Sequence, residues 1–535
     1  MSIPCILFNQ TSFSWPDGTR VLSDTTAAFG PGRTGLIGDN GAGKTTILRL
    51  INGELTPTSG TINVSAEIGY LPQNLTLVTH ALVSDLLGIR PQLDALAAIE
   101  TGETASTLYE TLGDGWDVRA RAEALLSRVG LGSLSLDRSV GTLSGGEAML
   151  VSLLGLRLAA TPIVLLDEPT NNLDAGARQQ LYEVVSDWQG ALIVVSHDIE
   201  LLDLMQETVE LRGGKLEVYG GGYTAYTELV ATEQAAAVQA LRTAEQGLRK
   251  EQRQRQEAET KLARRTHRSD KSYATKRASK IVMNTRRFQA QVSAGKLRES
   301  HDDRIQSARD IVAEQKSRLR DDDRVRIELP DPAVHAGRRL IELHHAGGIH
   351  TIIGPQRVAI TGRNGVGKTL LLETIFDDAL RASRTTHAVP ITSAIGYLPQ
   401  RLDGLDNNLS AIENIRTVAR RVPSVGIHAK LARFLIRGEA ANRAVGTLSG
   451  GERFRVALAR LLLADPPHQI LVLDEPTNNL DIQTRQALID SLRVYRGGLL
   501  IVSHDHDLLE QLGLDLQLAL DDEGWLTAVT QSALT

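Results

Sequence analysis

The chain has 535 residues, of which 42% are hydrophobic and 23% are charged, a composition typical of a folded protein with more than one domain. Its single cysteine, Cys5, excludes an intrachain disulfide, and no apolar stretch approaches the ~18 residues that a membrane-spanning helix needs. The first residues show no basic segment followed by an apolar core, so we expect no secretory signal, no membrane insertion and a cytoplasmic location.

The first motif in chain order is a glycine-rich loop at residues 38–45, GDNGAGKT, which returns as GRNGVGKT at residues 362–369. Each loop follows an apolar segment expected to be a strand and precedes an apolar helical pattern. Both fit the phosphate loop, in which backbone N–H groups surround phosphate oxygens, a lysine reaches the β- and γ-phosphates and a threonine holds Mg²⁺. The residues predicted to bind nucleotide here are Gly38, Asn40, Gly41, Gly43, Lys44, Thr45, Thr46, Gly362, Asn364, Gly365, Gly367, Lys368 and Thr369.

Three further residues are candidates for contacts around the nucleotides. Trp15 could stack on the adenine of the first site, whereas residues 339–351 offer only histidines for the second. Gln73 and Gln400 each end a Tyr-Leu-Pro-Gln sequence and are candidate sensors of Mg²⁺ and of the attacking water. Neither copy contains an Asn-Lys-x-Asp sequence for guanine, which favours ATP over GTP.

A Leu-Ser-Gly-Gly sequence comes next in each copy, at residues 143–146 and 448–451. It is followed by an unalternating apolar run that ends in Asp-Glu-Pro-Thr-Asn-Asn-Leu-Asp, at residues 167–174 and 474–481, and then by a second run that ends in Ser-His-Asp. Such runs are typical of strands buried on both faces of a parallel sheet, with active residues at their carboxyl ends.

The residues at these strand ends carry the predicted chemistry. Glu168 and Glu475 are the candidate bases that polarise the attacking water, and His197 and His504 can contact the γ-phosphate. The predicted Mg²⁺ ligands are Thr45, Gln73, Asp167, Thr369, Gln400 and Asp474.

The spacing between motifs predicts the domain organisation. The interval from the Gln to the Leu-Ser-Gly-Gly sequence is 70 residues in the first copy and 48 in the second, so we expect a helical surface subdomain of variable length there. We therefore predict an α/β fold with a first cassette at residues 1–225, a helical linker at 226–324 and a second cassette at 325–535.

The linker sequence differs in character from both flanking segments. Residues 249–298 carry a net charge of +12 in a chain whose total is −6, and apolar residues recur at sevens on both sides of this basic centre. The pattern predicts an antiparallel helical hairpin with arms of about 35 residues, roughly 50 Å long. A solvated linker is the alternative, but a positive field of this size favours a polyanionic partner such as RNA. The candidate RNA-binding residues are Arg264, Arg265, Arg268, Lys271, Lys276, Arg277, Lys280, Arg286 and Arg287.

The ordered motifs resemble the ATP-binding cassette superfamily. Two cassettes without a membrane segment, a basic helical linker and the Asn-Asn-Leu-Asp sequences resemble its ABC-F branch, and residues 293–298 resemble the linker of actinobacterial antibiotic-resistance members. The resemblance implies that one monomeric chain pairs its cassettes head to tail around two ATP molecules. Each site would then include the Leu-Ser-Gly-Gly loop of the other cassette, which adds Ser144, Gly145, Gly146, Glu147, Ser449, Gly450, Gly451 and Glu452 to the predicted nucleotide-binding residues.

The same resemblance implies an ATPase that binds the ribosome and places its linker near the P-site tRNA and the peptidyl-transferase centre. Antibiotic-resistance ribosome protection is the expected role, and a housekeeping translation factor of the same family is the alternative. From other classes, the ATPase subunit of a drug exporter and a DNA-maintenance protein remain open. In a drug exporter the basic insertion would have no obvious function. DNA-maintenance proteins usually have zinc-binding cysteines or far longer coiled coils, and this chain has neither.

The first Leu-Ser-Gly-Gly sequence departs from the family pattern. The second continues with Arg453 and has a later arginine, Arg460, whereas the first has Ala148 and Gly155 at those places. We expect unequal sites, with weaker support for the ATP bound at Lys368.

Overall fold

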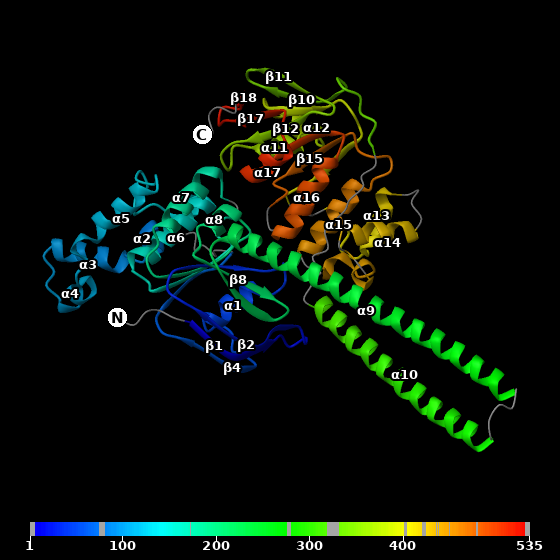
Figure 1. Ribbon diagram of the computed structural model, residues 1–535. Coiled ribbons are helices and arrows are strands. Elements are labelled where there is room, and N and C mark those ends of the chain that lie inside the picture. Colours follow the sequence, from blue (N-terminus) through cyan, green and yellow to red (C-terminus); the bar gives the residue numbers. More distant parts are fainter. Residues whose placement is uncertain are drawn as a thin grey trace. The chain divides into compact units, whose positions relative to one another are not determined.

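The structure is a computed structural model in which some parts of the chain are left undescribed. These are residues 1–5, 74–80, 172, 275–279, 318–330, 401–403, 420–423, 435, 437, 449, 478–479 and 530–535, and also the side chains of residues 265–266, 268–287, 289–291, 294, 317, 424–425 and 483. The chain forms two compact units, one made of Met1–Thr224 with Arg324–Thr535 and the other of Ala225–Asp323. The first unit holds both cassettes, and Figure 1 colours them from blue to green and from yellow-green to red.

Two sheets form the first cassette. An antiparallel sheet has the order β2-β1-β4, and a six-stranded sheet has the order β5-β6-β7-β3-β8-β9, parallel except for β9. The strands are β1 Ile6–Ser14, β2 Arg20–Phe29, β3 Arg33–Ile37, β4 Ser59–Val64, β5 Ile68–Leu71, β6 Ile163–Asp167, β7 Ala191–Val195, β8 Glu207–Arg212 and β9 Lys215–Gly220. Every residue of β6 and β7 is buried, which confirms the predicted parallel strands behind the carboxylate motifs.

Helices cover both faces of this sheet and form the subdomain after the first Gln. The helices are α1 Lys44–Ile51, α2 Val83–Leu86, α3 Arg90–Glu100, α4 Ser106–Leu112, α5 Val118–Arg128, α6 Gly145–Leu158, α7 Ala175–Ser186 and α8 Ile199–Asp203, with short 3₁₀ turns at Gly115–Asp117 and Val140–Thr142. The subdomain helices α2 and α5 contact α6 and bury it against the cassette core. The longer interval in the first copy is therefore a helical subdomain with its own apolar packing.

The burial of α6 explains why its sequence lacks the arginines of the second copy. Ala148 is fully buried, and a Cβ on Gly155 would lie 2.6 Å from the carbonyl oxygen of Leu86 in α2. A long cation at either position would lose its hydration and displace α2. In the second cassette the corresponding helix, α15, is less deeply covered, and Arg453 donates to Asn407 Oδ1 at 3.0 Å at the surface.

The second cassette repeats this topology. Its sheets have the orders β11-β10-β13 and β14-β15-β16-β12-β17-β18, and the second is parallel except for β18. The strands are β10 Arg339–His345, β11 Gly348–Ile353, β12 Arg357–Thr361, β13 His387–Pro390, β14 Ile395–Leu398, β15 Ile470–Asp474, β16 Gly498–Val502, β17 Leu516–Leu520 and β18 Leu526–Ala528. The helices are α11 Lys368–Glu373, α12 Asp378–Ala382, α13 Ala411–Val418, α14 Ser424–Arg433, α15 Gly450–Leu462, α16 Ile482–Val494 and α17 His506–Leu512, with 3₁₀ turns at Gly438–Ala441 and Val445–Thr447.

Two long helices, α9 Tyr223–Ala274 and α10 Lys280–Ser317, account for the other compact unit. They run side by side in opposite directions (Figure 1) and are joined by an ion pair of 3.1 Å between Arg255 and Asp302. Ile305, which with Val312 and Leu319 forms the seven-residue apolar repeat after the basic centre, is buried. The α9 helix has 52 residues and α10 has 38, so both exceed the expected arm of about 35. The predicted fold of two α/β cassettes with a long helical region between them is confirmed.

Candidate active sites

The two phosphate loops join β3 to α1 and β12 to α11. In the first loop Gly41 and Gly43 have φ angles of 82° and 106°, which side-chain-bearing residues adopt only with strain. A Cβ at Gly43 would in addition lie 2.3 Å from Val21 Cγ1. Gly365 and Gly367 repeat these angles at 83° and 100°. The loop geometry is therefore the same in both cassettes, and it depends on glycine.

The loop lysines are buried and fold back over their own loops. Lys44 Nζ donates to the carbonyl oxygens of Gly38 at 2.7 Å and Asp39 at 3.3 Å, and Lys368 Nζ makes the matching bonds at 2.7 and 2.9 Å. Burial lowers the pKa of both lysines, and the carboxylates at the neighbouring strand ends oppose that shift. Each ammonium is thus held at the loop, ready to exchange carbonyl oxygens for phosphate oxygens.

Asp167 and Asp474 close the buried strands β6 and β15. Burial raises the pKa of both carboxyls, and the hydroxyls of Thr45 and Thr369 oppose the shift. Within the described part of the chain, Asp167 Oδ1 and both carboxylate oxygens of Asp474 have no hydrogen-bond donor in normal geometry. Buried carboxylate oxygens without a donor beside a hydroxyl are the oxygen donors that Mg²⁺ prefers, so these residues fit the ion.

A magnesium ion at either site would need ligands beyond the protein. No group of three or more His, Cys, Asp or Glu side chains among the described residues could hold a metal ion. Mg²⁺ usually combines one or two carboxylates with substrate phosphates and water, and the phosphate loop beside each aspartate fits that arrangement.

The glutamates that follow these aspartates have strained backbones. Glu168 and Glu475 have φ angles of 51° and 45°, and the N–H of each donates at 2.8 Å to the carbonyl of the last residue of the adjacent strand. The hydrogen bond to the neighbouring strand holds the carboxylate in place despite the cost of the left-handed conformation. Unfavourable conformations of this kind cluster at functional sites.

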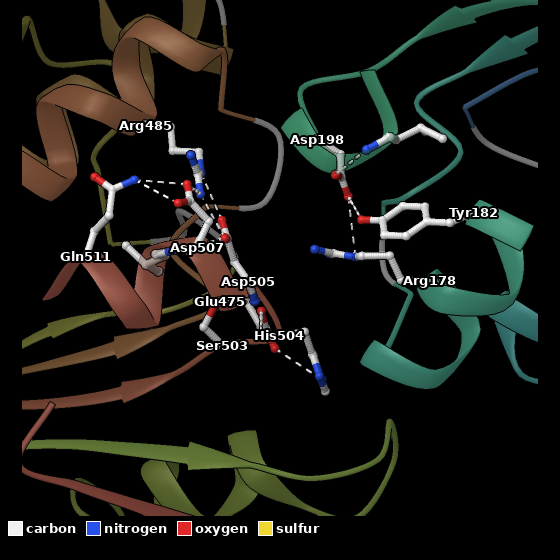
Figure 2. A network of polar contacts seen from close by, with 12 residues as sticks. Arg178, Tyr182, Asp198, Glu475, Arg485, Ser503, His504, Asp505, Asp507 and Gln511 are labelled. Atoms are coloured by element: carbon white, nitrogen blue, oxygen red, sulfur yellow. Dashed lines mark hydrogen bonds and ion pairs between the residues drawn. The ribbon is translucent and has the colours of Figure 1, made fainter. Parts of the chain in front are cut away.

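Each glutamate faces the histidine of the next strand end. His197 Nε2 lies 3.1 Å from Glu168 Oε1, and His504 Nε2 lies 3.4 Å from Glu475 Oε1; the second pair is drawn in Figure 2. Burial raises the pKa of Glu168 to about 8 and of Glu475 to about 7. Burial also lowers the pKa of His197 to about 3 and of His504 to about 4, so the imidazoles are neutral near pH 7.

Residues of the two cassettes meet at both phosphate loops. Asn40 N donates to Asp481 Oδ2 at 3.3 Å, and Asn364 N donates to Asp174 Oδ2 at 3.4 Å. A Cβ on Gly451 of the second signature would lie 3.4 Å from Asn40 Nδ2 of the first loop. Each phosphate loop therefore has a partner from the opposite cassette, and the first loop lies beside the second signature.

The remaining signature residues mainly make contacts within their own cassettes. Ser144 and Glu147 form a reciprocal cap of α6, with bonds of 3.2 and 2.7 Å, and Glu452 pairs with Arg443 at 3.3 Å. Ser449 lies outside the described residues. The structure leaves Gly145 and Gly450 exposed at the starts of α6 and α15, and Gly146 is buried.

The glutamines and Trp15 occupy different environments in the two cassettes. Gln400 lines a cavity of about 330 Å³ that also holds Lys368 and Glu475, whereas Gln73 is exposed after β5. Trp15 is half-buried and meets Phe13 edge-on at 5.3 Å. In the second cassette the matching turn presents a pair of stacked histidines, His345 and His350, with ring centroids 5.0 Å apart.

Most of the candidate RNA-binding residues lie outside the described side chains. Arg264 is exposed on α9. Arg265, Arg268 and Lys271 on α9, with Lys280, Arg286 and Arg287 on α10, are described only in their helical backbone, and Lys276 and Arg277 lie wholly outside the described residues.

Sequence analysis missed three residues that the structure brings to these sites. Asp174 and Asp481 end the Asn-Asn-Leu-Asp motif, and their repetition at matching positions was a usable signal for a role at the opposite loop. Arg178 lines the cavity around Lys368, and no motif marked it.

The geometry defines a class: paired nucleotide-binding cassettes that bind and hydrolyse ATP. The ABC transporter family model matches residues 24–171 and 351–478. The tylosin resistance ATP-binding protein TlrC of Streptomyces fradiae is 31% identical, over 91% of this chain and 92% of its own length. The energy-dependent translational throttle protein EttA of Mycobacterium tuberculosis is 30% identical, over 92% of this chain and 87% of its own length. An archaeal ribosome recycling factor, aABCE1, shares the fold, with a TM-score of 0.55 at 18% identity over 97% of this chain and 89% of its own.

The chain belongs to the ABC-F family of the ATP-binding cassette superfamily and is an ATPase. No helix in the described ranges is long and apolar enough to span a bilayer.

Proposed function

We propose that the chain is a ribosome-binding ATPase whose cassettes close on two ATP molecules and separate after hydrolysis. The observation that carries the proposal is the reciprocal pair of contacts from Asn40 to Asp481 and from Asn364 to Asp174. A nucleotide in either phosphate loop would lie at the junction of the cassettes. ATP would therefore favour the closed form, and loss of the γ-phosphate would remove that preference.

The roles of the site residues follow from their positions. Lys44 and Lys368 would bind the β- and γ-phosphates in exchange for their loop carbonyls. Glu168 and Glu475, held by strained backbone beside the loops, would orient the attacking water, and the neutral histidines would contact the γ-phosphate. Asp167 and Asp474, with Thr45 and Thr369, would hold Mg²⁺, which supplies positive charge to the phosphates when bound.

The basic helical unit supports RNA as the partner. Residues 249–298 carry +12 in an otherwise acidic chain, and polyphosphate backbones are the natural counterpart of such a field. We propose that this unit enters the ribosome near the P-site tRNA and the peptidyl-transferase centre. The names of the relatives, a tylosin resistance protein and a translational throttle protein, support a ribosomal role.

Protection of the ribosome against an antibiotic is the role we favour, because the tylosin resistance protein is 31% identical to this chain. A housekeeping translation factor is the second candidate, favoured by the 30% identity to the throttle protein. Growth of cells expressing the chain on macrolides, lincosamides, streptogramins and pleuromutilins separates the two, since a housekeeping factor would leave all four sensitivities unchanged.

The ribosomal role is tested by substituting both bases, Glu168→Gln with Glu475→Gln. Without the bases the chain should bind ATP without turnover and remain closed, so it should sediment with 70S ribosomes in ATP and not in ADP. A matched variant, Lys44→Ala with Lys368→Ala, should lose ATP and leave the ribosome fraction. Sedimentation of the double Glu→Gln variant away from ribosomes in ATP would refute the proposed function, and pelleting with membranes instead would favour an exporter subunit.

A further inference from the structure

Two arginines hold matching positions at the cassette junction, each four residues after the aspartate that contacts the opposite loop. Arg178 lies in α7 and Arg485 in α16. Arg485 is buried and fully engaged within its own cassette. Its Nε and Nη2 donate to Asp505 at 2.9 and 2.8 Å, and Nη2 donates to Asp507 at 2.6 Å (Figure 2).

Arg178 is held more loosely than its counterpart. Its Nε lies 3.6 Å from Asp198 Oδ2, beyond hydrogen-bonding distance, and has no other partner in the described part of the chain. Tyr182 explains the difference, because its hydroxyl donates to the same Asp198 oxygen at 2.7 Å (Figure 2). The second cassette has Ile489 at the position of Tyr182, so no hydroxyl from that position competes with Arg485 for Asp505. The guanidinium of Arg178 therefore keeps donors for another acceptor.

Arg178 lines a small cavity of about 70 Å³ with Glu168 and His197 of its own cassette, and the larger cavity at the second ATP site is where its donors can meet a phosphate. Although Arg178 belongs to the first cassette, it lines the same cavity of about 330 Å³ as Lys368, Gln400, Glu475 and His504. Burial dominates the pKa of both Glu475 and His504, and the positive charge of Arg178 makes a smaller contribution that lowers each pKa. The start of α7 thus brings an anion, Asp174, and a cation to the opposite phosphate loop.

We propose that Arg178 is a positioning residue of the second ATP site, supplied by the first cassette when the two pair, and that the first site has no equivalent. Its positive charge would lie beside Glu475 and His504, where the terminal phosphate must be bound and where negative charge spreads during phosphoryl transfer. Arg485 cannot serve the first site in this way without giving up its bonds to two carboxylates in its own cassette. The two sites would then differ in the opposite sense to the one expected from their signature sequences.

The inference rests on ATP hydrolysis at both sites, and purified chain without ribosomes tests it. Arg178→Ala and Arg178→Lys are made in a Glu168→Gln background, which leaves the second site as the hydrolysing one, and in a Glu475→Gln background, which leaves the first. Hydrolysis of a stoichiometric load of ATP is followed in a single turnover, so a slow background still gives a rate. Tyr182→Phe is the matched variant: it keeps the arginine but removes the competing hydroxyl, so Arg178 should pair with Asp198 and hydrolysis at the second site should slow.

In the Glu168→Gln background, Arg178→Ala should lower the hydrolysis rate on the order of tenfold, as for loss of a single electrostatic donor. The ATP concentration at half-saturation should stay within about twofold, and lysine should restore part of the rate. In the Glu475→Gln background, Arg178→Ala should not lower the hydrolysis rate further. Equal losses of rate in both backgrounds would overturn the proposal, and so would a change in the ATP concentration at half-saturation without a change in rate. It would also be overturned if the lysine variant, with an unchanged melting temperature, restored none of the rate. Because no ribosome is present, failure of the ribosomal role would leave this result untouched.

Discussion

At the residue scale, the two candidate bases lie at positions where the backbone is strained. Glu168 and Glu475 have positive φ angles in both cassettes, and both donate their N–H to the neighbouring strand. Such a conformation costs a residue with a side chain about 1 kcal/mol relative to glycine. The same left-handed conformation occurs at the matching position in both cassettes. This indicates that the direction in which it points the carboxylate matters for function.

Substituting Glu168 by glycine and by alanine measures this strain. Both variants lose the carboxylate and should lose turnover at the first site alike. Glycine relieves the left-handed strain, which is worth about 1 kcal/mol, and alanine does not. Because glycine also has the larger unfolded-state entropy, the net gain in stability of the glycine variant over the alanine variant should be smaller than that. Thermal unfolding without nucleotide gives the comparison. An alanine variant that is more stable than the glycine variant by about 0.5–1 kcal/mol would show that the backbone is unstrained at this position.

At the element scale, the basic helices α9 and α10 should determine binding to RNA and leave the nucleotide sites alone. Reversing the charges of Arg264, Arg265, Arg268, Lys271, Lys276 and Arg277 to Glu should abolish ribosome binding in ATP. ATP affinity measured by nucleotide titration should not change, since these residues belong to a separate compact unit. In partly reversed variants, the slope of log K against log salt should fall by about 0.7 for each phosphate that the protein no longer neutralises.

The same α9 helix supplies a control for that experiment. Arg249, Lys250 and Arg253 are exposed on α9 and lie further from its end at Ala274. If only the end of the helix meets RNA, reversing these three should change ribosome binding much less than reversing Arg264, Arg265 and Arg268. Equal losses from the two triplets would mean that net charge alone, and no particular part of the helix, governs the association.

At the scale of the whole molecule, the features that could be predicted from the sequence are those determined by short segments of the chain. Glycines with positive φ, buried β-branched runs and carboxylates at strand ends each follow from a short stretch of chain, so the cassettes and most of their site residues could be predicted. The role of Arg178 could not, because it depends on Tyr182 competing for Asp198 and on a loop that lies 190 residues further along the chain from Asp174. The burial of Gly155 under α2 likewise depends on a contact between segments that no single motif spans.

The proposed cycle depends on the cassettes pairing through nucleotide, and this can be measured directly. With Cys5 replaced by Ser, single cysteines at the exposed positions Glu110 and Asp522 place one fluorophore on each cassette. A non-hydrolysable ATP analogue should give one narrow, high-transfer population, because each bound γ-phosphate would lie at a junction already bridged by Asp174 or Asp481. ADP should restore a broader distribution. Asp174→Ala with Asp481→Ala should shift the closing midpoint to higher analogue concentration, by about tenfold if the two hydrogen bonds together contribute about 1.4 kcal/mol. An unchanged distribution with both sites saturated would mean that ATP does not draw the cassettes together, and release from the ribosome would then need another cause.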